Sequence, residues 1–227
     1  KEYSLDSVLP FIRQTAGPRT IIIPILNIYG TGARVQKELP DCTVLDGCIY
    51  VSASLEHPGV LVQHGPILRV VFGSRNPSYI SPILSAIQSD LCESGIDGVL
   101  STHIQRDALE KFSYVSPIGA SGVYLHAVAG DFQKEGPARE LFKSMIREIS
   151  ALAAAMGYPF EKDYVKINLE ILSNLSADAT TSMQRDIMEG KPSELDGLVM
   201  EPLRLAKKYS VSMPCYEEVA NALCPLE

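Results

Sequence analysis

Hydrophobic residues recur along this chain with two different periods, and the change between them divides it into two parts. Up to about residue 101, short runs of β-branched and apolar residues alternate with helical segments. From His103 onward, only helical periodicity remains. Strands that alternate with helices are typical of an α/β sheet, whereas helices alone indicate a helical bundle. We therefore predict an α/β domain over residues 1–101 and an all-helical domain over residues 102–227.

The pattern of the first part predicts a helix, a buried strand and a hairpin. Leu5, Leu9 and Ile12 lie on one helical face of residues 1–14. The apolar run 20–26 predicts a buried strand, in which a proline favours an edge or a strand end. The segments 59–63 and 68–72 are expected to pair as a hairpin that turns at residues 64–66. We also expect a short helix up to residue 39, extended pieces at 43–53 and 95–101, and a helix at 77–93.

The second part is predicted to contain six helices. Gly157 and Pro159 should end the long second helix, and Pro202 should kink or break the fifth helix near Met200. The expected helices are 103–129, 137–156, 163–175, 182–189, 193–209 and 215–223.

The stretch 181–197 combines a helix break with closely spaced polar groups. Gly190 is free to take the left-handed conformation that ends a helix. Ser193 and Asp196 have the spacing of a capping box at the start of the next helix. Ser182 and Glu194 would then both lie at helix N-termini, where backbone N–H groups favour an anion. The plainer interpretation is a corner between two helices with two capping serines.

Composition and charge exclude several classes of function. The chain has 227 residues, 46% of them hydrophobic, and a net charge of −7 without a stripe of Lys and Arg, which argues against nucleic acid or an anionic membrane surface as the partner. No apolar run approaches the ~20 residues that cross a bilayer. The five scattered cysteines, without a CxxC pair, indicate a reduced, cytoplasmic protein. The four histidines lack metal-ligand spacing, so we infer no metal site.

Several motifs resemble those of the ketopantoate reductases (2-dehydropantoate 2-reductases), in the order in which that family carries them. The C-terminal signature of the family is similar to Ser-Met-x-x-Asp-Ile from Ser182 and Gly-x-x-Ser-Glu-Leu-Asp from Gly190. The segment from Pro24 through Asn27 to Gly30 resembles the family's Pro-x-x-x-Asn-Gly-x-Gly turn. The segments 58–60, 64–66 and 72–74 resemble two of its strands, and Asp107–Phe112 resembles the opening of its helical domain.

This resemblance implies both a fold and an activity. The fold is the second half of an α/β Rossmann-type domain, followed by an all-α domain like the C-terminal domain of 6-phosphogluconate dehydrogenase. The activity is NADPH-dependent reduction of ketopantoate to pantoate, on the route to pantothenate and coenzyme A, by a monomer or homodimer. No G-x-G-x-x-G follows a strand near Lys1, so the loop that would hold the cofactor pyrophosphate is absent from the printed chain. We therefore expect an N-terminally truncated form.

The resemblance also assigns roles to five residues. Lys111 matches the lysine that gives the ketone oxygen its proton or polarises the carbonyl, and Glu194 matches the glutamate beside that lysine, the substrate and the cofactor. Ser182 matches the serine that binds the substrate carboxylate. Asn27 matches the asparagine that reaches the nicotinamide ribose and the substrate, and Lys1 falls at a cofactor-binding lysine. Without the resemblance, Lys111 reads as a solvated lysine on a helix face, and Glu194 as a carboxylate favoured by a helix start.

Two positions depart from the family pattern and leave the substrate open. Family members commonly carry asparagines four and eight residues after the lysine, where this chain has Val115 and Gly119. A pocket without those amides should bind a hydroxylated substrate less well. Nearby serines are candidates to replace them, at 113, 116 and 121. The alternatives are therefore a related reductase of another small 2-oxo acid, or a non-catalytic helical module for dimerisation or binding.

Overall fold

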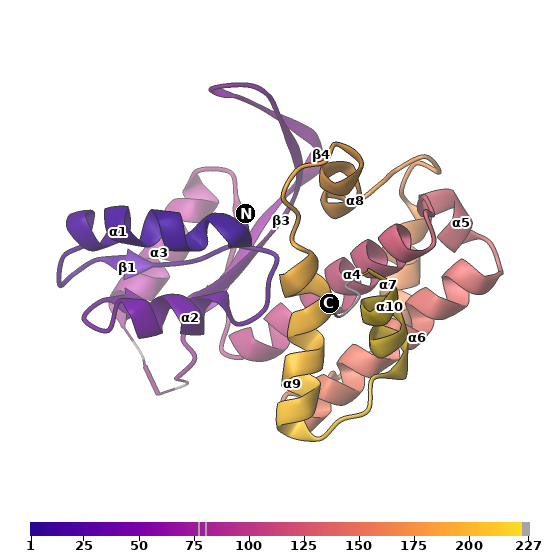
Figure 1. The fold of residues 1–227 in the computed structure, drawn as a ribbon. Coiled ribbons are helices and arrows are strands. Elements are labelled where there is room, and N and C mark those ends of the chain that lie inside the picture. Colours follow the sequence, from indigo (N-terminus) through magenta and orange to yellow (C-terminus); the bar gives the residue numbers. More distant parts are fainter. Residues whose placement is uncertain (77, 80, 224–227) are drawn as a thin grey trace. The chain divides into compact units, whose positions relative to one another are not determined.

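The structure, a computed structural model, describes residues 1–76, 78–79 and 81–223. It divides into two compact units, an α/β unit formed by Leu5–Ala108 and a helical unit that begins at Leu109 and includes Lys1–Ser4 (Figure 1). The division lies seven residues after the border that the hydrophobic pattern indicates, inside a continuous helix.

The α/β unit contains two small sheets. Strands β1 and β2 pair in parallel, and β4 lies between β3, which is antiparallel to it, and β5, which is parallel to it. Adjacent residues of β4 face opposite sides of this sheet, so Phe72 packs with Leu84 of α3 while Val71 packs with Ile104. The elements of this unit are α1 (Leu5–Thr15), β1 (Ile21–Ile22), α2 (Thr31–Glu38), β2 (Thr43–Val44), β3 (Asp46–His57), β4 (Val60–Gly73), α3 (Pro82–Glu93) and β5 (Asp97–Leu100).

The predicted hairpin turn at residues 64–66 is wrong. The two segments on either side belong to one strand, β4, and the turn that joins it to β3 lies at Pro58 and Gly59. Between two paired positions, β3 runs from Val51 to Ala53 while antiparallel β4 runs back from Leu68 to Gln63, so residues 64–67 form a bulge. Glycines with positive φ occur at both places, at 85° for Gly59 and 86° for Gly65, so their local chemistry is the same.

The predicted strand at 20–26 is much shorter in the structure. Only Ile21 and Ile22 pair with β2, and Pro24 follows in irregular backbone. Proline has no N–H to donate to a ladder, so the pairing ends before it. The predicted helix at 77–93 begins at Pro82, and positions 77 and 80 lie outside the described residues.

The helical unit follows the predicted order, with one break that the periodicity missed. The expected helix 103–129 is α4 (Ile104–Tyr124) followed by α5 (Ala129–Gln133). It stops because His126 takes a φ of 51°, a left-handed conformation that ends a helix. The remaining elements are a 3₁₀ turn η1 (Glu2–Ser4), α6 (Pro137–Ala155), α7 (Tyr164–Ser173), α8 (Ser182–Met188), a π-helix η2 (Asp196–Met200), α9 (Glu201–Tyr209) and α10 (Pro214–Leu223).

The predicted helix stop at Gly190 is confirmed. Gly190 has a φ of 64°, and its N–H and that of Lys191 bond to the carbonyls of Ile187 and Asp186, which is a Schellman motif. At Met200, where a kink or break was expected, the chain stays helical: the π-helix η2 passes directly into α9, with Pro202 in the first turn of α9.

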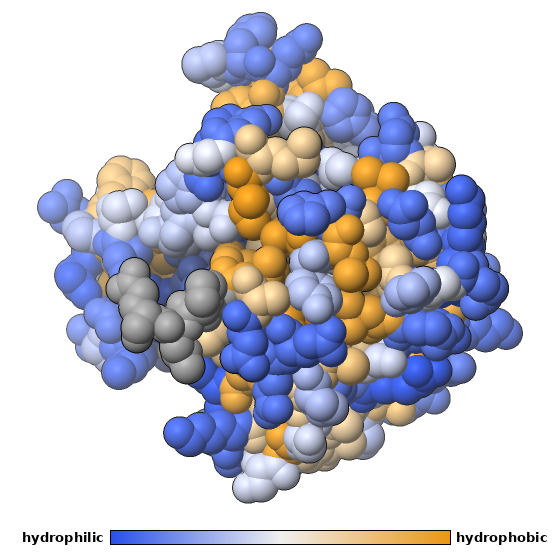
Figure 2. Space-filling model, turned by 45° about the vertical axis from the view of Figure 1, so that its right-hand side comes forward, coloured by the Kyte–Doolittle hydropathy of each residue, from blue (hydrophilic) through white to orange (hydrophobic). Residues whose placement is uncertain are grey.

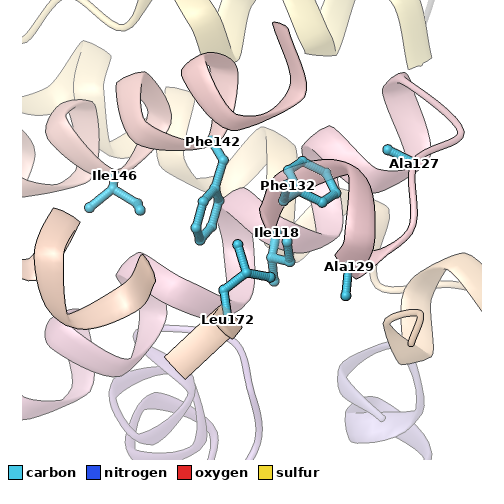
Figure 3. Close-up of a cluster of buried hydrophobic side chains, with 7 residues drawn as sticks. All are labelled: Ile118, Ala127, Ala129, Phe132, Phe142, Ile146 and Leu172. Carbon is cyan, nitrogen blue, oxygen red and sulfur yellow. The ribbon is translucent and has the colours of Figure 1, made fainter. Parts of the chain in front are cut away.

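The core of the helical unit lies where α4, α5, α6 and α7 meet. Figure 3 shows Phe142 of α6 beside residues of the other three helices. The Phe142 ring makes edge contacts with the rings of Tyr114 and Phe132, at centroid distances of 6.0 and 5.9 Å. The buried members of this cluster are Ile118, Ala127, Ala129, Phe132, Phe142, Ile146 and Leu172.

At the surface, hydrophobic side chains lie among hydrophilic ones on the face that Figure 2 shows. Within the described part of the chain, none of the helices has both the length and the apolar character needed to cross a membrane.

Candidate active site

Helix α4 carries the lysine to which the sequence assigns proton donation. Lys111 is half-buried on this helix. Val115 and Gly119 follow it at intervals of four residues, so the three positions lie along one face. Gly119 is buried.

Helix α8 packs closely against α4 because α4 presents glycines to it. A Cβ atom at Gly119 would lie 3.2 Å from the Met183 methyl, and one at Gly122 would lie within 3 Å of the Gln184 side chain. The Gln184 amide donates to the Ala127 carbonyl just beyond α4, at 2.7 Å. Ser182, the predicted carboxylate-binding serine, is half-buried at the first position of α8.

The residue that caps α8 is Thr181 and not Ser182, so the plainer interpretation, in which Ser182 is a capping serine, is wrong. The Thr181 hydroxyl accepts the Gln184 N–H, and the Gln184 side chain accepts the Thr181 N–H, which together form a capping box. The Ser182 hydroxyl is therefore not used as the cap of its own helix.

Glu194 is one of the few charged side chains that the helical unit buries, with 3% of its surface exposed. Its Oε1 accepts the Glu2 backbone N–H at 3.0 Å, and its Oε2 lies 3.8 Å from the Lys1 ammonium. The Lys1 ammonium also donates to Asp186 at 2.7 Å. A buried carboxylate is costly unless it is hydrogen-bonded and paired, and this cluster supplies both.

The structure thus brings two predicted cofactor-binding residues, Lys1 and Glu194, into one cluster. It adds Asp186, to which the sequence assigned no role. Asp186 stands within the motif that begins at Ser182, but no local signal could show its pairing, because its partner is 185 residues away.

The predicted helix start at Ser193 is also wrong. Helical backbone begins at Leu195, which makes no side-chain cap hydrogen bond, and Glu194 immediately precedes it. Both carboxylate oxygens of Asp196 accept hydrogen bonds from the Arg204 guanidinium, at 2.9 and 2.7 Å. A bidentate arginine is a stronger partner for a carboxylate than a neutral backbone N–H, and Arg204 lies eight residues, about two turns, further along the chain.

Asn27 belongs to the α/β unit, in the half-buried loop between β1 and α2. A chain of polar groups holds this loop. The Tyr29 hydroxyl donates to the Gln105 side chain at 2.6 Å, the Gln105 amide donates to Asp46, and the Arg75 guanidinium donates to Asp46 at 2.6 Å. Burial raises the pKa of Asp46, against the lowering effect of Arg75.

The three serines that were candidates to replace the missing asparagines donate their hydroxyl protons to backbone carbonyls of the protein. All three are fully buried. Ser113 donates to the Glu110 carbonyl, Ser116 to the Leu198 carbonyl and Ser121 to the Pro117 carbonyl. A serine hydroxyl has one proton, so the expectation that these residues supply substrate hydrogen bonds is wrong.

Comparisons with known proteins identify relatives over nearly the whole chain. Two family models match: "Ketopantoate reductase PanE/ApbA C terminal" over residues 103–227, which is 125 of 227 residues, and "Ketopantoate reductase PanE/ApbA" over residues 1–77. An uncharacterized oxidoreductase, YkpB of Bacillus subtilis, is 23% identical over 96% of this chain and 72% of its own length. A 2-dehydropantoate 2-reductase of a Nostoc species is 22% identical over 94% of this chain and 67% of its own length.

Solved structures share the fold. A 2-dehydropantoate 2-reductase of Geobacter metallireducens is 20% identical with a TM-score of 0.88, over 98% of this chain and 73% of that chain. A D-mandelate dehydrogenase in complex with NADH is 19% identical with a TM-score of 0.85, over 98% of this chain and 75% of that chain. At these identities the likeness establishes the fold, a partial Rossmann-like sheet with helices followed by a helical C-terminal domain.

Proposed function

Because the chain belongs to the ketopantoate reductase PanE/ApbA family of oxidoreductases, we propose that it acts as a nicotinamide-dependent reductase of a small 2-oxo acid. The leading substrate is ketopantoate, which would be reduced to pantoate with NADPH. The observation that carries the proposal is the buried Glu194 carboxylate in the same compact unit as Lys111. Acidic side chains are seldom fully buried, so a buried carboxylate held by a backbone N–H and next to an ammonium is a candidate for a functional role.

We assign the nicotinamide end of the cofactor to Asn27. The Asn27 side chain offers both a donor and an acceptor, which suits a ribose hydroxyl, from a loop on the carboxyl side of a strand. When bound, the cofactor supplies the hydride that C2 of the 2-oxo acid accepts. The printed sequence has no G-x-G-x-x-G, so we assign the pyrophosphate to no residue of this chain.

The remaining chemistry falls to three side chains. The Lys111 ammonium donates its proton to the ketone oxygen as negative charge develops there. The Ser182 hydroxyl donates a hydrogen bond to the substrate carboxylate and holds the ketone in place. The Glu194 carboxylate accepts hydrogen bonds from the Lys111 side chain and from the hydroxyl that forms on C2 of the product. The 2-oxo acid, the hydride and one proton give the 2-hydroxy acid.

A second candidate is a related reductase whose substrate lacks the terminal hydroxyl of ketopantoate. The Met183 methyl occupies the space beside Gly119, Val115 is apolar, and the three nearby serines donate their protons elsewhere. The solved structure named D-mandelate dehydrogenase shares the fold, and mandelate carries an apolar ring in place of a hydroxylated chain.

The test compares two acids that differ by one hydroxyl. Ketopantoate and trimethylpyruvate have the same branched skeleton, so the ratio of their kcat/KM values isolates that group. A site that hydrogen-bonds the hydroxyl should prefer ketopantoate by roughly 100-fold or more, whereas a site that ignores it should keep the ratio within about tenfold. Both assays are run with NADPH and with NADH. No turnover of either acid, or of phenylglyoxylate, would contradict the proposal and favour the non-catalytic module.

Ser182→Ala should raise KM for the 2-oxo acid by about tenfold and leave KM for NADPH within about twofold. The reason is that the variant removes one hydrogen bond to a charged group, which contributes about 1.5–3 kcal/mol. Ser173→Ala on α7 is the matched control, because its hydroxyl is exposed and bonds only to its own helix. Equal changes in both KM values for Ser182→Ala would remove the carboxylate-binding role.

A further inference from the structure

Leu198 connects the Glu194 segment to helix α4. Its N–H donates to the Glu194 carbonyl at 2.9 Å. Its own carbonyl accepts the Ser116 hydroxyl of α4 at 2.6 Å. In a regular α-helix that carbonyl would accept the N–H of residue 202, but Pro202 has none. The hydrogen bond from Ser116 therefore occupies a carbonyl that the proline has released.

Tyr216 of α10 completes this connection. Its hydroxyl lies 2.5 Å from the Ser116 oxygen, and its side chain is fully buried. Because Ser116 gives its only proton to Leu198, Tyr216 must be the donor in the second hydrogen bond. Burial also raises the pKa of Tyr216, so the phenol stays protonated and remains a donor.

The segment held in this way is a π-helix, η2, which begins two residues after Glu194. The N–H of Glu201 bonds to the Asp196 carbonyl, five residues back. Single π turns are uncommon and often lie at functional sites, where they shift the register of the backbone. Here the shift in register determines how the backbone continues from Glu194 into α9.

We propose that Ser116 and Tyr216 are positioning residues, which fix the Glu194 carboxylate relative to the helix that carries Lys111. This inference rests on the proposed function of Lys111 and Glu194. Neither positioning residue meets the substrate. Ser116 lies five residues after Lys111 on α4. Its hydroxyl donates to the Leu198 carbonyl, and the Leu198 N–H in turn donates to the Glu194 carbonyl. Its loss lets the carboxylate move without removing any catalytic group.

A neighbouring serine provides the matched control. Ser121 is also fully buried on α4, but its hydroxyl donates to the Pro117 carbonyl of the same helix. Ser121→Ala therefore removes a buried hydroxyl without touching the Glu194 segment. Tyr216→Phe removes the second donor and leaves the bond between Ser116 and Leu198 in place.

The experiment measures kcat, both KM values and the pH profile of kcat for the wild type and these three variants. We expect Ser116→Ala to lower kcat by about 10- to 100-fold, since a displacement of about 1 Å costs up to about 100-fold. KM for the nicotinamide cofactor should stay within about twofold, and the pH profile should shift. Tyr216→Phe should show a smaller loss, and Ser121→Ala should keep the kcat and the pH profile of the wild type.

Amide hydrogen exchange at Leu198 and Glu201 gives a second readout that needs no substrate. Ser116→Ala should speed exchange at both amides, and Ser121→Ala should not. Equal kcat in Ser116→Ala and Ser121→Ala, or equal exchange in the two, would overturn the inference. If the wild type reduces no 2-oxo acid, the proposed function fails, whereas the exchange measurement still decides whether Ser116 holds the segment.

Discussion

Replacement of Lys111 by alanine is expected to remove most of the turnover and leave the melting temperature close to that of the wild type. A positioned general acid contributes about 10²- to 10⁴-fold to the rate, and we expect kcat to fall within that range. Alanine is a better helix former than lysine, so α4 should keep its helix. Turnover is measured by oxidation of NADPH, and the melting temperature by circular dichroism.

Two further variants show what the lysine does. Lys143→Ala is the matched control, because Lys143 is a half-buried lysine on a helix of the same unit, paired with Glu140 at 2.6 Å. It should keep the wild-type kcat. Lys111→Arg keeps the positive charge but releases a proton far less readily, so it separates proton donation from polarisation of the carbonyl. A Lys111→Ala variant with wild-type kcat would show that the catalytic assignment is wrong.

Helix ends marked by glycine were the most predictable features of this chain because their chemistry is local. At a glycine with positive φ, the N–H groups of the glycine and of the next residue donate to the last carbonyls of the preceding helix. Gly190 therefore ends α8, and Gly157 ends α6, where the sequence indicates. Pro202 acts through its missing N–H, which also depends only on neighbouring residues. The helical order of the second unit follows from such signals.

Features that depend on distant partners were not predictable from the pattern. Gly59 and Gly65 have nearly the same φ, and only pairing with β3 makes one a turn and the other part of a bulge. Asp196 has the spacing of a capping residue, yet it pairs with Arg204. His126 ends α4 without a glycine, so periodicity carried the predicted helix past it.

The candidate site also combines features that the local sequence indicates with contacts that depend on distant residues. The motif around Ser182 and Glu194 identified which residue types to examine, but their partners come from other parts of the chain. Lys1 lies next to Asp186, and Ser116 reaches Leu198 across 82 positions. Sequence motifs therefore indicated which residues to consider, whereas the hydrogen bonds that position those residues could be identified only from the fold.

The surroundings of Gly119 illustrate what only packing can add. The family resemblance places Gly119 where related chains commonly carry an asparagine, but it does not show what fills the space. In the structure the Met183 methyl lies beside it, 3.2 Å from where a Cβ would be. A side chain at this position would contact that methyl, so an asparagine here requires the Met183 side chain to shift.

Phe142→Ala is expected to cause the largest loss of stability, about 3–5 kcal/mol in the free energy of unfolding. The ring is fully buried and joins helices α4, α5, α6 and α7 through the cluster in Figure 3. Its removal leaves a cavity next to the Tyr114 and Phe132 rings, because a close-packed core relaxes only partly around a lost side chain.

Such a loss is a large part of the total stability of a domain, which is typically about 5–15 kcal/mol, so the variant should unfold at a much lower urea concentration. Phe11→Ala is the matched control, because the Phe11 ring on α1 is 65% exposed and its loss should cost less than about 1 kcal/mol. Since α4 carries both Lys111 and Tyr114, Phe142→Ala should also reduce turnover before global unfolding. Equal urea midpoints for the two variants would mean that the cluster around Phe142 does not hold the helical unit together.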